Sequence, residues 1–156
     1  MKSPESLRQV AEFHHTFKHP VEKQPVIPAE ARCKLRVALI AEELEELKQA
    51  IASKDLTEVA DALCDIQYVL SGAVLEFGLA DKFKELFDEV HRSNMSKACQ
   101  TRKEAEETVA WYREQRDTPC FYEESEGKFL VYREGDRKTL KSVRYSPAQL
   151  QQKLQR

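Results

Sequence analysis

The chain has 156 residues, a length that predicts a single domain with its own core. One third of the residues are charged, but 25 basic and 27 acidic residues nearly cancel, which argues against a general nucleic-acid-binding protein. No stretch has the length and apolarity of a membrane span, and the opening MKSPESLRQV has no apolar signal segment. The four cysteines form no C-x-x-C pair, so we expect reduced thiols, no zinc site and a cytoplasmic location.

Helical spacing and proline positions define the first elements. Ser3 followed by Pro4 predicts a cap and a first helical position for a helix that runs to about Phe17. Three prolines then predict an irregular loop over residues 19–27. Apolar residues at helical spacing predict a second helix over residues 30–53.

Further helices follow at short intervals. Asp55 is a suitable N-cap for a third helix over residues 56–77, which Gly78 would end. A fourth helix is expected over residues 80–90. Thr101 and the glutamate three residues later match a capping box, which predicts a fifth helix to about Arg116.

The C-terminal part has a different pattern. Apolar runs at 129–132 and 140–143 flank the turn residues 134–136, which predicts a short β-hairpin or an extended tail. The sequence therefore predicts an all-α bundle of four to five helices over residues 1–118. Residues 119–156 are expected to pack on that same domain.

Acidic residues gather on the second and third helices. Positions three and four residues apart share one helix face, and the short link at Lys54 and Asp55 should make the two helices antiparallel neighbours. The two acidic clusters lie at similar distances from this link, so they should meet at one height. The candidate residues are Glu42, Glu43, Glu46, Glu58, Asp61 and Asp65.

Several of these carboxylates border apolar positions, where like charges are costly unless a cation compensates them. Magnesium is the natural compensation, because it takes oxygen ligands and then grips the oxygens of a phosphate chain. A glutamate-rich helix alone is more often a solvated face. The second acidic cluster on the next helix favours the metal site.

The motifs as a whole resemble a known superfamily. An E-x-x-E pair, Glu43 to Glu46, and an E-x-x-D pair, Glu58 to Asp61, resemble the all-α NTP pyrophosphohydrolases, which include MazG, the dimeric dUTPases and phosphoribosyl-ATP pyrophosphohydrolase. The stretches FHHTFKHP, VHRSNMSK and GDRKTLK resemble the MazG-like branch more closely, although Arg137 stands where that branch would have glycine.

The resemblance implies a MazG-like helical bundle that cleaves a nucleoside triphosphate to the monophosphate and pyrophosphate. It also implies a house-cleaning role in the nucleotide pool. It implies Mg²⁺, with Mn²⁺ as a substitute, and a homodimer or homotetramer without nucleic-acid or membrane partners. The six carboxylates above inherit the metal-binding role, and Glu43 is the expected general base. The expected substrate contacts are Asn94, Lys97, Lys138, Lys141 and Tyr145.

Other functions remain open. A di-iron carboxylate bundle needs Glu-x-x-His on two helices, and only Glu12 to His15 matches it well. The chain could instead be a non-catalytic helical module that binds nucleotide or a protein partner, or a phosphoribosyl-ATP pyrophosphohydrolase. The histidines at 14, 15 and 19 are expected to have structural or substrate-pocket roles.

Overall fold

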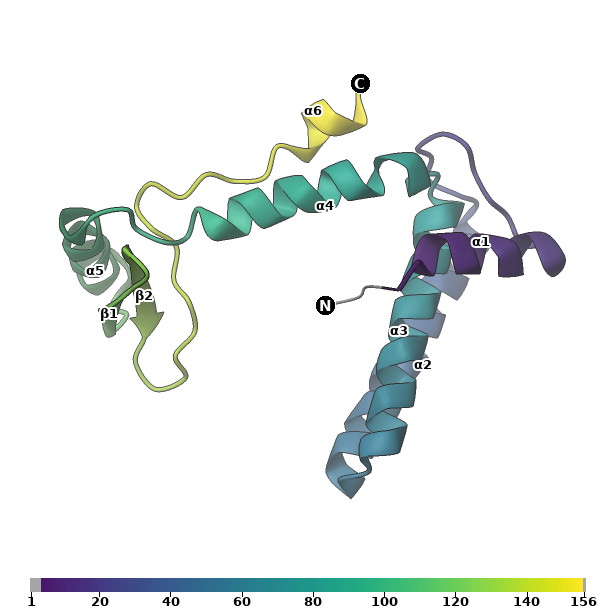
Figure 1. Cartoon of the computed structure of the whole chain (residues 1–156), viewed down its shortest axis with the longest axis horizontal. Coiled ribbons are helices and arrows are strands. Elements are labelled where there is room, and N and C mark those ends of the chain that lie inside the picture. The colour runs from purple at the N-terminus through teal and green to yellow at the C-terminus, as the bar shows by residue number, and fades with distance from the viewer. Residues whose placement is uncertain (1–3, 156) are drawn as a thin grey trace. The chain divides into compact units, whose positions relative to one another are not determined.

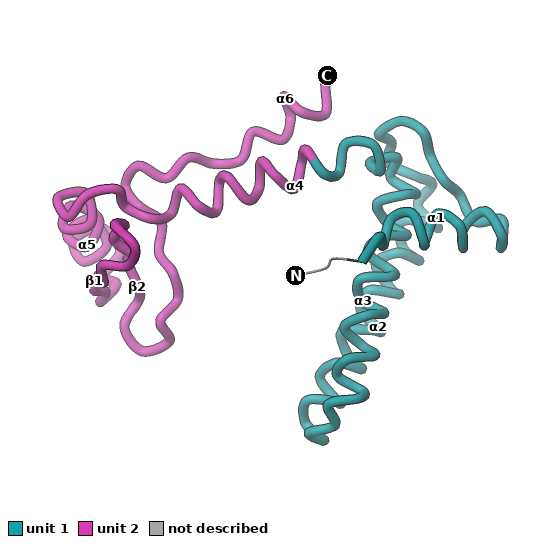
Figure 2. The backbone as a smooth tube through the Cα atoms, in the orientation of Figure 1, with its two compact units in different colours: residues 1–84 teal, residues 85–156 magenta. Residues whose placement is uncertain are grey.

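The structure is a computed structural model that describes residues 4–155. Over that range the chain forms six helices and one two-stranded antiparallel sheet, which confirms the expected helical fold class (Figure 1). The chain divides into two compact units, residues 1–84 and 85–156 (Figure 2). The grouping of residues 1–118 with 119–156 in one domain stays a prediction.

Unit 1 contains an antiparallel hairpin of two long helices, α2 (Glu30–Ser53) and α3 (Leu56–Glu76) (Figure 1). The link is tight because Lys54 takes a left-handed conformation, with φ of 57°. Asp55 caps α3 as predicted, since its carboxylate accepts hydrogen bonds from two backbone N–H groups of the first turn at 2.9 and 3.2 Å. These local features fix the two acidic helices side by side.

A short helix, α1 (Ser6–Thr16), packs against α3 and buries Val10 and His14. It begins at Ser6 rather than Pro4, and the expected cap Ser3 lies outside the described residues. The irregular loop after α1 is confirmed. The loop is attached to the end of α3, where the Val26 N–H donates to the carbonyl of Phe77 at 3.1 Å.

Gly78 allows this attachment. Its φ is +65°, and a Cβ atom built on it would lie 1.9 Å from the carbonyl oxygen of Gln24. A side chain at this position therefore meets both backbone strain and a direct clash with the loop.

We expect Gly78→Ala to lower the free energy of unfolding by more than about 2 kcal/mol, because the strain and the clash add. Gly127→Ala is the matched control, since Gly127 also has a positive φ of 73° but no atom within 4 Å of an added Cβ. Urea unfolding of both variants measures the difference. Equal losses would show that the clash with Gln24 has no effect.

The apolar residues of the α2–α3 hairpin stay largely in solvent. Arg36 and Ala50 are the buried residues of α2 within the described chain, so most of the apolar residues that recur at helical spacing on α2 are not covered. Leu44 is 47% exposed, Ile51 59% and Leu63 52%. Large apolar surface on a helical hairpin is a feature of surfaces that bind another protein.

Unit 2 holds most of α4 (Ala80–Met95), α5 (Arg102–Arg116), the strands β1 (Cys120–Ser125) and β2 (Lys128–Arg133), and the short helix α6 (Leu150–Leu154). Helix α4 continues five residues beyond the predicted end. Thr101 caps α5 as predicted, by accepting from the Glu104 N–H at 3.2 Å. Helix α5 packs on the sheet over a small core of Cys99, Ala105, Cys120, Val131 and Leu140.

The hairpin differs from the predicted one in one of its strands. Strand β2 pairs with β1, and the connecting residues Glu126 and Gly127 both have positive φ, the conformation that a two-residue hairpin turn needs. The expected C-terminal hairpin is confirmed, and residues 134–136 do form a turn, but the strand predicted at 140–143 is wrong, because β2 pairs with β1. Residues 138–140 lie beside β2 through a bridge between Tyr132 and Thr139 and a hydrogen bond from the Leu140 N–H to the carbonyl of Val131.

No single helix between residues 4 and 155 is long and apolar enough to cross a membrane. Helices α3 and α4 meet the length and composition criteria only when they are taken together across the break between them.

Candidate active site

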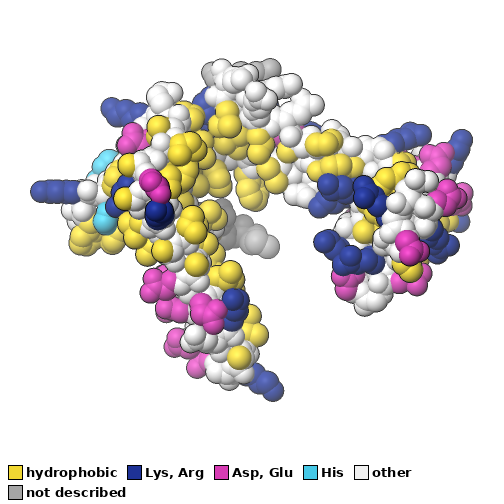
Figure 3. All heavy atoms as spheres, turned by 180° about the vertical axis from the view of Figure 1, so that it is seen from behind, with side chains coloured by type: hydrophobic (Ala, Val, Ile, Leu, Met, Phe, Trp, Pro, Cys, Tyr) yellow, Lys and Arg dark blue, Asp and Glu magenta, His cyan; other side chains and the backbone are white. Residues whose placement is uncertain are grey.

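Carboxylates of α2 and α3 line a groove near the helix link. Glu46 from α2 and Glu58 and Asp61 from α3 border a concavity of about 550 Å³ whose floor includes Ala50 and Ala62. The two alanines are small enough to leave this space between the helices. Figure 3 shows acidic side chains gathered along this part of the hairpin, toward the end where the helices connect.

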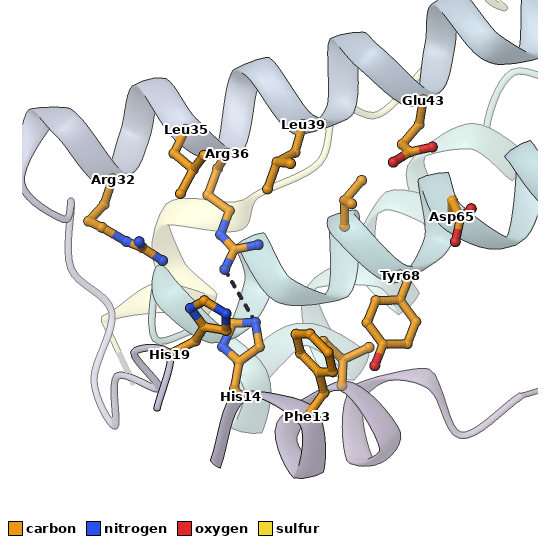
Figure 4. Close-up of a pocket in the computed structure, with 12 residues that line it drawn as sticks. Phe13, His14, His19, Arg32, Leu35, Arg36, Leu39, Glu43, Asp65 and Tyr68 are labelled. Carbon is orange, nitrogen blue, oxygen red and sulfur yellow. Dashed lines mark hydrogen bonds between the residues drawn. The ribbon is translucent and has the colours of Figure 1, made fainter. Parts of the chain in front are cut away.

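One turn further from the link, Glu43 and Asp65 face each other at the edge of a second pocket (Figure 4). Both are half-buried. Partial burial raises the pKa of Glu43, and the negative charges of Asp65, Glu46, Glu42 and Asp61 raise it further. The predicted carboxylates therefore act on one another electrostatically.

The carboxylates are not arranged around one point. Glu42 is exposed and lines neither pocket, and within residues 4–155 no three His, Cys, Asp or Glu side chains are placed to hold one ion. The donor set still fits magnesium, because every candidate ligand supplies carboxylate oxygens. Burial and then repulsion by the neighbouring carboxylates raise the pKa of Glu43, and a divalent cation would relieve that repulsion.

The second pocket, about 340 Å³ in volume, is mainly apolar and aromatic. Figure 4 shows side chains of α1, the following loop, α2 and α3 pointing into one space. Phe13 stacks on His19 with ring centroids 5.8 Å apart and meets Tyr68 edge-on at 5.6 Å. An aromatic pocket with a few polar groups at its ends is typical of a site for a flat organic group.

A buried charged network supports the wall of this pocket. Glu76, only 1% exposed, accepts hydrogen bonds from Arg36 at 2.5 Å and from Arg32 at 3.1 Å. His14 donates from Nδ1 to the carbonyl of Pro20 at 2.8 Å, so its Nε2 accepts from Arg36 at 3.2 Å. The network joins α1, α2 and α3 behind the pocket.

The pKa values of His14 and Glu76 are both lowered in the folded chain, for different reasons. Burial lowers the pKa of His14; the bond to Pro20 opposes this, and the positive charge of Arg36 lowers it again. Burial alone would raise the pKa of Glu76, but the hydrogen bonds from Arg36 and Arg32 outweigh it and hold the pKa below its usual value. Both groups therefore prefer to be deprotonated in the folded chain.

We expect the free energy of unfolding to fall as the pH drops from about 7 to about 5, because His14 binds a proton more readily in the unfolded chain. The contribution of Glu76 is present above its unfolded pKa and is lost only at lower pH. Urea unfolding at several pH values should show a flatter dependence for His14→Gln. His15→Gln, at an exposed neighbour, should keep the wild-type dependence, and a wild-type slope in His14→Gln would contradict the assignment.

The other predicted site residues lie in unit 2. Asn94 lies in the last turn of α4, and its side-chain oxygen accepts a hydrogen bond from Lys97 Nζ at 2.7 Å. The Lys141 Nζ lies 4.4 Å from the ring centroid of Tyr145, whose hydroxyl bonds to Ser93 at 2.9 Å. Lys138 is exposed on the segment beside β2.

The sequence analysis gave no role to Arg32, Tyr68 and Glu76. The signal for Glu76 was a single carboxylate within the apolar run AVLEF, which requires a buried cationic partner. Arg32 and Arg36, one turn apart on α2, are the partners that such a search would have found. Tyr68 had no comparable signal, because an aromatic residue on a helix is most often a packing residue.

Two comparisons with known proteins bear on this site. Residues 10–94, more than half of the chain, match the family model of phosphoribosyl-ATP pyrophosphohydrolase (PRA-PH). A 78-residue segment is 37% identical to "Uncharacterized protein L479" of Acanthamoeba polyphaga mimivirus, and it covers 47% of this chain and 31% of that protein. The chain thus matches less than a third of this relative. The family match includes all six carboxylates and Asn94, but not Lys97, Lys138, Lys141 or Tyr145.

Proposed function

Because the chain belongs to the phosphoribosyl-ATP pyrophosphohydrolase family, within the all-α NTP pyrophosphohydrolase superfamily, we propose that it is a magnesium-dependent nucleoside triphosphate pyrophosphohydrolase. It would convert a ribo- or deoxyribonucleoside triphosphate and water to the monophosphate and pyrophosphate, as a house-cleaning reaction of the nucleotide pool.

One observation carries this proposal: the aromatic pocket ends at Glu43 and Asp65, and the acidic groove begins one helical turn away at Glu46. A nucleobase is a flat group that would pack against the aromatic surface formed by Phe13, His19 and Tyr68. The phosphates of the same nucleotide would then extend along the groove. Along the helix hairpin, the aromatic pocket is followed by the acidic groove, just as the base of a nucleotide is followed by its phosphates.

A polyanion can lie along carboxylates only if cations separate them. Glu42, Glu43, Glu46, Glu58 and Asp61 would hold Mg²⁺, with Asp65 as a further ligand and Mn²⁺ as a substitute. Bound there, the metal supplies neutralisation of the charge on the phosphate oxygens.

The protein side chains would orient the substrate and transfer the proton. In the proposed reaction, Glu43 accepts the proton of the water that attacks the α-phosphorus. The α-phosphorus–oxygen bond to the β-phosphate breaks, and pyrophosphate leaves with the bonding electrons. Asn94, Lys97, Lys138, Lys141 and Tyr145 are proposed substrate contacts, of which the lysines stabilise negative charge.

The exposed apolar side chains of α2 and α3 support self-association. Leu44, Ile51 and Leu63 would leave water if a second copy of the chain covered the hairpin. We therefore include a homodimer or homotetramer in the proposal. Such surfaces are destabilising in a separate monomer.

The family match also favours a second candidate, phosphoribosyl-ATP as the substrate. Incubation of the full chain with Mg²⁺ and a panel of NTPs, dNTPs and phosphoribosyl-ATP, scored by pyrophosphate release, separates the two. Cleavage of one or more NTPs or dNTPs, lost in EDTA and restored by Mg²⁺ or Mn²⁺, supports the proposal. Cleavage of phosphoribosyl-ATP alone favours the second candidate, and no cleavage of any substrate excludes both.

A further inference from the structure

Unit 2 contains a basic concavity that the proposed metal chemistry does not use. It has a volume of about 530 Å³, and no carboxylate is among its lining residues. It is formed by the C-terminal part of α5, the end of β2 and the segment beside it. Its charged and aromatic lining comprises Lys97, Arg116, Arg133, Lys138, Lys141 and Trp111, with Tyr112 next to the indole.

Most of these cations lack an acidic partner. Arg133 pairs with Asp136 at 2.5 Å, but in the described chain no carboxylate lies within 4 Å of the charged groups of Lys97, Arg116, Lys138 or Lys141. Residues 85–156 contain 14 basic and 13 acidic residues. Positive charge is therefore concentrated in this concavity and is not a general property of the unit.

The backbone that carries the lysines is held in place. The Arg133 N–H donates to the carbonyl of Lys138 at 2.9 Å, and the Leu140 N–H donates to that of Val131 at 2.8 Å. The Lys141 N–H donates to the hydroxyl of Tyr112 at 3.1 Å. A fixed backbone lowers the entropy cost of gathering several cations around one anion.

An aromatic surface lies beside the cations. Trp111 is 39% exposed, its ring meets that of Tyr112 edge-on at 4.9 Å, and the Arg116 guanidinium lies 5.4 Å from its centroid. Stacking on an exposed indole stabilises a nucleobase, and unpaired lysines and arginines stabilise phosphates. The concavity thus combines both features of a nucleotide-binding site.

We propose that this concavity binds a nucleoside triphosphate, with its phosphates among Lys97, Lys138, Lys141 and Arg116 and its base against Trp111. The proposal goes beyond the proposed function: the nucleotide bound here is a second molecule, not the substrate whose base is proposed to lie in the aromatic pocket, and the three lysines contact it. It adds Trp111 and Arg116, and it requires neither the acidic groove nor a metal. A mononucleotide fits the confined volume and the near-neutral surroundings better than an extended nucleic acid.

Trp111 is the single tryptophan of the chain, so its fluorescence reports on this concavity. The full chain is titrated with ATP in excess EDTA, which prevents metal-dependent binding at the acidic groove. We expect saturable quenching that weakens as salt rises, and weaker binding of AMP than of ATP, because the phosphates supply most of the attraction. Inorganic triphosphate should compete with ATP.

Lys138→Ala combined with Lys141→Ala should weaken ATP binding at least about tenfold, because the variant loses two charge-assisted contacts to the phosphates. Arg116→Ala should weaken it as well. Lys103→Ala is the matched control, since Lys103 is an exposed cation of the same helix outside the concavity. Circular dichroism verifies that each variant is folded, and equilibrium dialysis with labelled ATP measures binding without relying on fluorescence.

The outcomes separate this proposal from the proposed function. Quenching retained in Glu46→Gln, together with weakened binding in the lysine variant, supports it. Absence of quenching by millimolar ATP, or unchanged affinity in the lysine variant, overturns it even if pyrophosphate release is normal. Tighter binding of single-stranded DNA than of ATP also overturns it. Metal-free ATP binding without any pyrophosphate release would sustain this site and reject the proposed catalysis.

Discussion

Glu46→Gln and Asp61→Asn should each lower pyrophosphate release by about a thousandfold or more, while the chain stays folded. Both substitutions keep the size of the side chain and remove one negative charge from the acidic groove. The proposed reaction loses part of its cation-binding charge, so turnover falls. Folding should not suffer, because removing one of several like charges relieves repulsion; the melting temperature should stay equal or rise.

Glu45→Gln is the matched control for this prediction. Glu45 lies next to Glu46 in sequence, but it is exposed and pairs with Lys48 at 3.0 Å outside the groove. Its replacement should leave pyrophosphate release within about twofold of wild type. Full activity in both Glu46→Gln and Asp61→Asn would reject the site assignment.

Glu76→Gln should lower the free energy of unfolding by about 3–5 kcal/mol. Glu76 is buried and accepts from two arginines, one of which, Arg36, is itself only 7% exposed. Without the carboxylate, the guanidinium of Arg36 remains in a nonpolar environment without a counter-charge. Within the described residues, the buried Nε of Arg36 already lacks a hydrogen-bond acceptor. Loss of the Glu76 carboxylate would therefore leave a second part of the same guanidinium without its charged acceptor.

Urea unfolding measures this loss, and two comparisons isolate its cause. Glu30→Gln removes an exposed pair with Lys34 and should cost less than about 1 kcal/mol. The double variant Arg36→Met with Glu76→Leu should be more stable than Glu76→Gln, because it removes the arginine charge together with its carboxylate partner. A loss in Glu76→Gln no larger than in Glu30→Gln would show that the buried network is not stabilising.

The helical elements and the acidic groove were predictable because their causes are local. The cap at Asp55, the short link and the helical spacing of Glu46, Glu58 and Asp61 together place carboxylates on facing sides of α2 and α3. A C-terminal hairpin was predicted correctly, but its partner strand was not, because two turn sequences compete in the tail. Glu126-Gly127 closes the β1–β2 hairpin, whereas the turn at 134–136 leads into a segment that makes one bridge to β2.

The aromatic pocket and its buried support depended on tertiary contacts. Phe13, His19 and Tyr68 come from three separate segments, and nothing in their local sequence specifies that they meet. The ion pair of Arg36 and Glu76 joins residues 40 positions apart in sequence, and it depends on the packing of α2 on α3. The helical spacing also predicted which side of α2 is apolar, but it could not show that this side stays exposed.

The uncovered leucines and isoleucine of the α2–α3 hairpin have a consequence for the groove that lies between the same two helices. Ala50 and Ala62 are buried between the helices, but the larger apolar side chains of Leu44, Ile51 and Leu63 on the same hairpin are 47–59% exposed. If a second copy of the chain covers these apolar side chains and thereby stabilises the hairpin, the specific activity depends on protein concentration. We expect specific activity to decline as the enzyme stock is diluted and to recover on reconcentration, with a midpoint that reports the dissociation constant of the assembly.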